Sequence, residues 1–255
     1  MSPFVAGMLV LVVSFGGALA GMQLRRSLPP HHLDESSGNT VKVAIGLIAT
    51  MTALVLGLIT GSAKSSFDET SKAIERGAAE LISLDRALVR YGPETAEVRK
   101  ALRSALAARI DAAWPQGNGP PRLEVEDVRR AENIVAAIHA LEPTNEEQRW
   151  LRSRSADLGE AVLDARWLTA NAGSASMLGP FLTALLFWLA MTFTSFGLFA
   201  PRNGTVLGAL LVCAVSVASA VFLVLEMDGP FTGLVKVSPE PLRYALTQMD
   251  RGPEI

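Results

Sequence analysis

The sequence contains few of the residues that catalytic and metal-binding proteins concentrate. Of 255 residues, one is cysteine, two are tyrosine and three are histidine. The lone Cys213 excludes an internal disulfide and a thiolate metal cluster. No serine lies in a nucleophile elbow, and no Gly-rich loop follows a strand pattern. Basic patches interleaved with aromatic residues are also lacking. We therefore predict neither an enzyme nor a nucleic-acid-binding protein.

One group of possible metal ligands needs separate consideration. His31 and His32 are followed by Asp34 and Glu35 in a segment rich in Pro and Ser. A protein site for zinc needs at least a third well-placed ligand, and none accompanies them. We interpret the segment as a solvated connector, and we predict no metal and no cofactor.

Charged residues are missing from four long stretches of the chain. A bilayer core of roughly 30 Å requires about 20 apolar residues in a helix, and each stretch is long enough. A charge at the centre of such a helix costs roughly 2.5 to 3.5 kcal/mol, so four charge-free stretches indicate membrane spans. The predicted spans lie near 3–24, 43–63, 178–200 and 204–226. The first lacks a basic n-region and is too long for a secretory signal, so we interpret it as an uncleaved span.

Between the second and third spans the composition changes completely. Residues 64–166 contain 16 Lys or Arg and 18 Asp or Glu, and their apolar residues recur at spacings of three and four. This periodicity predicts four amphipathic helices and no strand. The apolar positions are Ile74, Ala78, Leu81, Leu84, Leu88 and Tyr91; Val98, Leu102, Ala105 and Ile110; Val128, Ala131, Ile134, Val135, Ile138 and Leu141; and Leu151, Leu158, Val162 and Ala165.

Local signals set the ends of these helices. Gly92-Pro93 and Trp114-Pro115 are predicted stops. Thr144 and Glu147 have the spacing of a capping box. Ser238 precedes a short C-terminal helix whose apolar face, including Leu242, could dock on the bundle or on a partner.

The predicted fold is an all-α membrane protein with a helical insertion. Its parts are two spans in residues 1–63, a soluble helical domain at 64–177, two further spans at 178–226 and a tail with a helix at 227–255. No break separates the second span from the first soluble helix, so we expect one continuous helix. Seven Lys or Arg residues flank the spans on the side of the soluble domain, and four flank them on the other. These are Lys64, Lys72, Arg76, Arg166, Lys236, Arg243 and Arg251, against Arg25, Arg26, Lys42 and Arg202. The positive-inside rule then favours a cytosolic domain.

A stripe of small residues runs along the second span. Its members recur every three or four residues and end in a lysine: Gly46, Thr50, Ala53, Gly57, Gly61 and Lys64. Such a stripe either admits a close helix neighbour or lines a pathway. Stripes of the same spacing in two other spans indicate tight packing there: Gly17 and Gly21 in the first, and Ala209, Cys213, Ser216 and Ala220 in the fourth.

Two acids lie at the boundary of the fourth span. Glu226 and Asp228 occur in LEMDGPF, where the apolar stretch ends. An acid near bilayer depth is a candidate functional group. The alternative is that both acids lie in the interfacial water.

Together with the four spans and the long insertion, several segments resemble a known family. They are ALVLGLITGSAKSSFD, LDRALVRYGPE, ARWL, FGLFAPRNGTV and FLVLEMDGPFTGLVKVSPEPLRYAL. These resemble the bestrophin-like family, a group of bacterial membrane proteins of unknown function, over nearly the whole chain from Val41 onward.

The resemblance implies a function. Bestrophins are pentameric anion channels with cytosolic termini and insertion, whose second span lines a pore with a hydrophobic neck. Their neck segment is similar to residues 54–58, so Leu54 and Leu58 would form the neck here. Both replace aromatic residues, and no acidic cluster matches the bestrophin calcium clasp. An oligomeric chloride channel in the plasma membrane, pentameric by analogy, is therefore expected, with lipid and small anions as its partners. The alternative is a non-conducting sensor or interaction protein built around the helical bundle.

Overall fold

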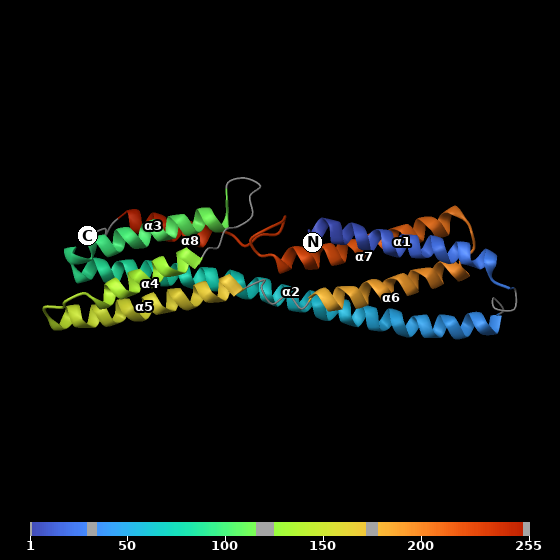
Figure 1. Cartoon of the computed structure of the whole chain (residues 1–255), viewed down its shortest axis with the longest axis horizontal. Coiled ribbons are helices and arrows are strands. Elements are labelled where there is room, and N and C mark those ends of the chain that lie inside the picture. Colours follow the sequence, from blue (N-terminus) through green and yellow to red (C-terminus); the bar gives the residue numbers. More distant parts are fainter. Residues whose placement is uncertain (1, 30–34, 116–124, 172–177, 252–255) are drawn as a thin grey trace. The chain divides into compact units, whose positions relative to one another are not determined.

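The computed structural model describes residues 2–29, 35–115, 125–171 and 178–251, and every regular element within them is a helix (Figure 1). The predicted all-α fold is confirmed. The elements are α1 Pro3–Ser27, α2 Glu35–Tyr91, the 3-10 turn η2 Pro93–Thr95, α3 Ala96–Ala113, α4 Val125–His139, α5 Glu146–Asn171, α6 Leu178–Phe199, α7 Gly204–Asp228 and α8 Glu240–Asp250.

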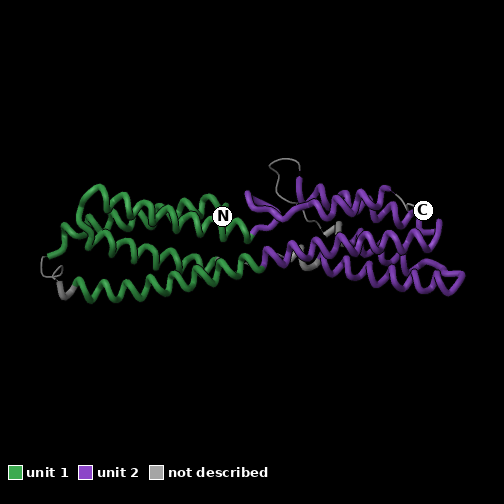
Figure 2. The backbone as a smooth tube through the Cα atoms, turned by 180° about the vertical axis from the view of Figure 1, so that it is seen from behind, with its two compact units in different colours: residues 1–65, 176–228 green, residues 66–175, 229–255 purple. Residues whose placement is uncertain are grey.

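The chain forms two compact units, each built from segments distant in sequence (Figure 2). Residues 1–65 and 176–228 form the membrane unit, and residues 66–175 and 229–255 form the helical unit. Helix α2 contributes to both. It continues for 57 residues without a break, as the missing stop signal in the sequence predicted.

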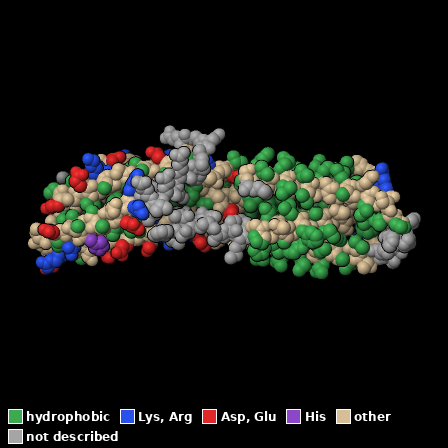
Figure 3. Space-filling model, viewed as in Figure 1, with side chains coloured by type: hydrophobic (Ala, Val, Ile, Leu, Met, Phe, Trp, Pro, Cys, Tyr) green, Lys and Arg blue, Asp and Glu red, His purple; other side chains and the backbone are tan. Residues whose placement is uncertain are grey.

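Four helices, α1, α2, α6 and α7, are long and apolar enough to cross a membrane. Their observed bounds agree with the predicted spans to within a few residues, except that α2 extends far beyond the second span. Hydrophobic side chains cover the visible face of this unit (Figure 3).

Glycines allow α1 and α6 to approach each other closely. A Cβ atom added to Gly21 would overlap the backbone of Thr194, and one added to Gly197 would overlap the backbone of Ala18. A Cβ on Gly17 would lie 3.1 Å from the carbonyl oxygen of Ala190. Close backbone approach through small residues is how apolar helices gain packing energy in lipid. The predicted packing role of Gly17 and Gly21 is confirmed.

The predicted small-residue stripe of α7 does not pack within this chain. Ala209, Cys213 and Ser216 are exposed and Ala220 is only partly buried, whereas Leu210, Ala214 and Ala218 are buried in the core that α7 shares with α1. Small residues occur on both faces of α7, and a membrane helix is apolar all round. Periodicity therefore did not distinguish the packed face from its neighbour, which is one residue away.

The helical unit has a core to which five helical segments contribute. Buried side chains come from the second half of α2 and from α3, α4, α5 and α8. They are Ile74, Ala78, Leu81, Leu84 and Leu88; Val98, Leu102, Leu106 and Ile110; Ile134 and Ile138; Ala156, Leu158 and Val162; and Leu242, Ala245 and Met249. The predicted amphipathic faces are therefore the core faces, apart from the side chain of Val128, which lies outside the described residues.

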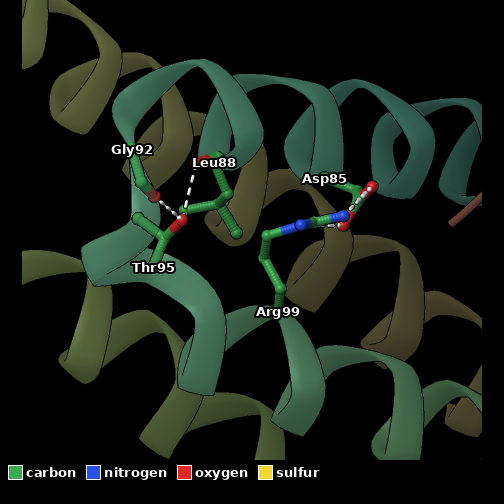
Figure 4. A network of polar contacts seen from close by, with 5 residues as sticks. All are labelled: Asp85, Leu88, Gly92, Thr95 and Arg99. Atoms are coloured by element: carbon green, nitrogen blue, oxygen red, sulfur yellow. Dashed lines mark hydrogen bonds and ion pairs between the residues drawn. The ribbon is translucent and has the colours of Figure 1, made fainter. Parts of the chain in front are cut away.

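A polar network fixes the turn from α2 to α3 (Figure 4). Gly92 takes φ 137°, a conformation that side chains with a Cβ rarely adopt. The hydroxyl of the buried Thr95 lies 2.6 Å from the carbonyl oxygen of Leu88 and 2.8 Å from that of Gly92. One turn further on, Arg99 donates two hydrogen bonds to Asp85, from Nε at 2.8 Å and from Nη2 at 3.2 Å. The Thr95 hydroxyl thus supplies a side-chain donor for the carbonyl oxygen of Leu88, and the backbone N–H of Thr95 donates to that of Gly92.

The cap of α5 lies one residue later than predicted. The side chain of Asn145 accepts from the backbone N–H of Gln148 at 2.8 Å, and Gln148 accepts in return from the N–H of Thr144 at 2.8 Å. Glu147, predicted to reach back to the helix start, instead pairs with Arg90 at 3.3 Å. Asn caps a helix at least as well as Thr, so both registers satisfied the sequence rule.

The C-terminal segment docks on the helical unit. Trp114 at the end of α3 donates from Nε1 to the carbonyl oxygen of Val237 at 2.9 Å, and its ring meets Phe231 edge-on. Ser238 accepts from the N–H of Glu240 at the start of α8, although the cap position itself is occupied by Pro239, one residue later than predicted. Of the two possibilities left open for this helix, docking on its own bundle is the one observed.

Candidate functional site

Helix α2 is the span that the rest of the chain covers least. Within the most apolar part of each span, 11% of residues are buried in α2, against 33% in α1, 33% in α6 and 22% in α7. The face that α2 turns toward the other helices includes Ile45, Thr52 and Ala63, which are buried. The remaining faces are accessible, and all the candidate residues of this helix lie on them.

The small-residue stripe of α2 has no neighbour from its own chain at its glycines. All six members of the stripe are exposed. A Cβ added at Gly46, Gly57 or Gly61 would meet nothing within 4 Å. This is the opposite of Gly21 in α1, where the neighbouring backbone fills that space. The stripe is thus open to lipid, to a second copy of the chain or to a water-filled path. A close helix neighbour and a pathway, the two interpretations made from the sequence, are both compatible with this exposure.

The two candidate neck residues are also exposed. Leu54 is 64% exposed and Leu58 is 65% exposed. They continue a row with Leu47 and Met51, which are 65% and 50% exposed. At about 100° per residue, this leucine row lies about a quarter of a turn from the small-residue stripe. Leu47 and Met51 were missed in the sequence, although their spacings of four, three and four residues were visible there.

The polar groups on these accessible faces bond within the helix. Thr50 donates to the carbonyl oxygen of Gly46 at 2.9 Å, and Thr60 donates to that of Leu56 at 2.7 Å. The hydroxyl hydrogens of these two threonines are therefore used within the helix, and only their oxygen lone pairs face outward as acceptors. The stripe ends at the exposed Lys64, and the surface before it is apolar.

The two boundary acids differ in burial. Glu226 is 5% exposed, whereas Asp228 is only partly buried. For Glu226 the burial speaks against the alternative of a group in the interfacial water, because its side chain lies inside the protein. Glu226 lies near the C-terminal end of α7, whereas Leu210 and the connection to α6 lie near its N-terminal end.

Metal binding finds no support in the described part of the chain. No three or more His, Cys, Asp or Glu residues there lie close enough together to hold an ion. The pair His31 and His32 lies outside the described residues, as does Asp34.

Four apolar helices of spanning length and an attached helical unit define the chain as an all-helical membrane protein. The sequence matches the Bestrophin-like domain over residues 12–242, which is most of its length. The chain therefore belongs to the bestrophin-like family, and the resemblance seen in its motifs is confirmed. Comparisons with curated proteins and with solved structures each gave no match.

Proposed function

We propose that the chain is one subunit of an oligomeric channel for small anions, with the accessible face of α2 lining the pathway. The observation that carries the proposal is the open space beside Gly46, Gly57 and Gly61 on the least covered span. Membership of the bestrophin-like family supports it, because bestrophins conduct through their second span. Five subunits are proposed by analogy with bestrophins.

The accessible face of α2 has the chemistry of a gated pathway rather than of a binding site. Leu54 and Leu58 lie one turn apart and project apolar side chains from the helix. A ring of such side chains from several subunits forms a constriction that closes by dewetting and requires no charge. Lys64, the last member of the stripe, supplies positive charge for an anion at the end of the path.

Chloride flux from proteoliposomes tests this function. The wild-type protein is expected to pass chloride, and Leu54→Ala with Leu58→Ala is expected to raise the flux, because truncation widens and wets the neck. The matched control is Leu207→Ala with Leu211→Ala on α7, which has the same spacing and is also exposed, at 36% and 42%. No flux in any variant, or equal gains in both pairs, would refute the assignment.

We further propose that the helical unit lies in the cytosol of a cell whose plasma membrane holds the spans. The excess of seven Lys or Arg over four beside the spans supports this orientation. A non-conducting sensor with its bundle outside is the alternative. Lys100 is exposed on α3, so Lys100→Cys in a Cys213→Ser background provides the label. We expect an impermeant thiol reagent to label this cysteine only after the cells are permeabilised. Labelling of intact cells would show that the helical unit lies outside and would contradict the proposed orientation.

A further inference from the structure

A groove opens on the membrane unit between α2, α6 and α7. Its volume is about 380 Å³, within the roughly 300 to 1,000 Å³ typical of ligand sites. Its walls include Ala49, Phe196 and Leu210, and Lys42 and Phe199 lie at one end of it. Apart from Lys42 and a single serine, the lining side chains are apolar, and none is acidic.

Lys42 marks the edge of the apolar zone. It directly precedes the charge-free stretch 43–63, and its Nζ lies 5.9 Å from the centroid of the Phe199 ring. A cation over an aromatic face is attracted by the ring electrons, so the ammonium group is held beside the groove. Ala49 lies seven residues further along α2, which is about 10 Å deeper into the apolar zone. The groove therefore has a cationic end and an apolar length.

The charge around this end is mostly positive: Arg25, Arg26, Lys42 and Arg202 lie there, against Glu35 at the start of α2. Arg25 donates to the carbonyl oxygen of Ala200 at 2.8 Å, and Arg202 donates to that of Met22, so two further cations are anchored on the backbones of neighbouring helices. The stretches 2–29, 38–63 and 178–225, which form most of this unit, contain no Asp or Glu. Figure 3 shows basic side chains at one end of the apolar surface.

We propose that this groove binds an anionic phospholipid, with an acyl chain along Ala49, Phe196 and Leu210 and the phosphate on Lys42. Lipid is favoured over a second copy of the chain because the same end of a second copy would bring more cations to Lys42. An acyl chain fills the groove by van der Waals packing against its apolar lining, and the phosphate offsets the positive charge of Lys42. The groove shares Gly46 with the small-residue stripe but includes neither neck residue, Leu54 or Leu58, and lipid binding is measured without conduction.

Native mass spectrometry of the full-length protein in detergent, with phosphatidylglycerol or phosphatidylcholine of the same acyl chains, tests the proposal. Wild-type protein is expected to retain phosphatidylglycerol preferentially, and Lys42→Gln to weaken that binding about fivefold. Arg26→Gln is the matched control, because it removes the same charge at the same end from an exposed residue outside the groove. Ala49→Phe is expected to fill the groove and lower the retention of both lipids.

Four results would overturn the site. Equal retention of the two lipids would show an unselective lipid coat, and equal losses in Lys42→Gln and Arg26→Gln would show a diffuse charge effect. The third is a photoreactive phosphatidylglycerol that labels peptides other than those containing residues 42–49 and 195–200. Crosslinking between copies from position 49 would assign the groove to a second subunit instead. Because lipid retention is measured without flux, its failure leaves the channel proposal intact, and the reverse also holds.

Discussion

The buried ion pair beside the α2–α3 turn should be sensitive to the loss of one partner. The side chain of Asp85 is 8% exposed and that of Arg99 is 18% exposed, and two hydrogen bonds join them. Arg99→Leu would leave the carboxylate inside the helical unit without its cation. Removing one partner of a buried pair typically costs about 3 to 5 kcal/mol. Because Arg99 is partly accessible, we expect the lower end, about 3 kcal/mol.

The double variant distinguishes a buried charge from lost packing. Asp85→Leu with Arg99→Leu removes both charges, and such replacements are often neutral or stabilising. We therefore expect it to be more stable than Arg99→Leu alone. The control is Arg90→Leu, which breaks the pair with Glu147, whose side chains are 63% and 67% exposed. Exposed pairs contribute about 0 to 1 kcal/mol, so little change is expected there.

Thermal unfolding in detergent, followed by tryptophan fluorescence, measures these differences. At about 2 to 4 °C per kcal/mol for a chain of this size, Arg99→Leu should lower the midpoint by about 6 to 12 °C. The reasoning fails if Arg99→Leu and Arg90→Leu shift the midpoint equally, or if the double variant is less stable than Arg99→Leu.

Three further substitutions test the packing. Gly197→Ala should destabilise the membrane unit by about 1 to 3 kcal/mol, because its Cβ would overlap α1, whereas Gly16→Ala meets open space and should not; thermal unfolding compares them. Thr95→Val removes the hydroxyl that donates to the carbonyl oxygen of Leu88 and should cost about 1 to 3 kcal/mol, read as a lower midpoint. Trp114→Phe loses the bond to Val237 and should speed limited proteolysis of the C-terminal segment; unchanged cleavage would contradict its anchoring role.

The sequence was most informative where charge and apolarity change sharply. The limits of the spans follow from the cost of burying charge, and the continuity of α2 follows from the absence of any stop before Gly92. The core faces of the helical unit follow from amphipathic periodicity, because water lies on one side of each helix.

It was least informative where several residues satisfy the same rule. Thr144 and Asn145 both make good caps, and tertiary contacts of Glu147 with Arg90 decide between them. On α7 the packed face and the predicted stripe are offset by one residue, and both contain small side chains. Because lipid is as apolar as the protein core, the polarity of the residues does not indicate which face is packed. The groove beside Lys42 is formed by residues of three helices that are distant in sequence, so no local sequence pattern indicates it.

Thiol modification inside proteoliposomes tests the channel most directly. Leu58→Cys in a Cys213→Ser background places one thiol on the accessible face of α2, and Leu211→Cys places one on α7. A small charged thiol reagent is expected to change chloride flux through Leu58→Cys and to leave Leu211→Cys unaffected. Flux that is insensitive at position 58, or that is absent altogether, would contradict a pathway along the second span.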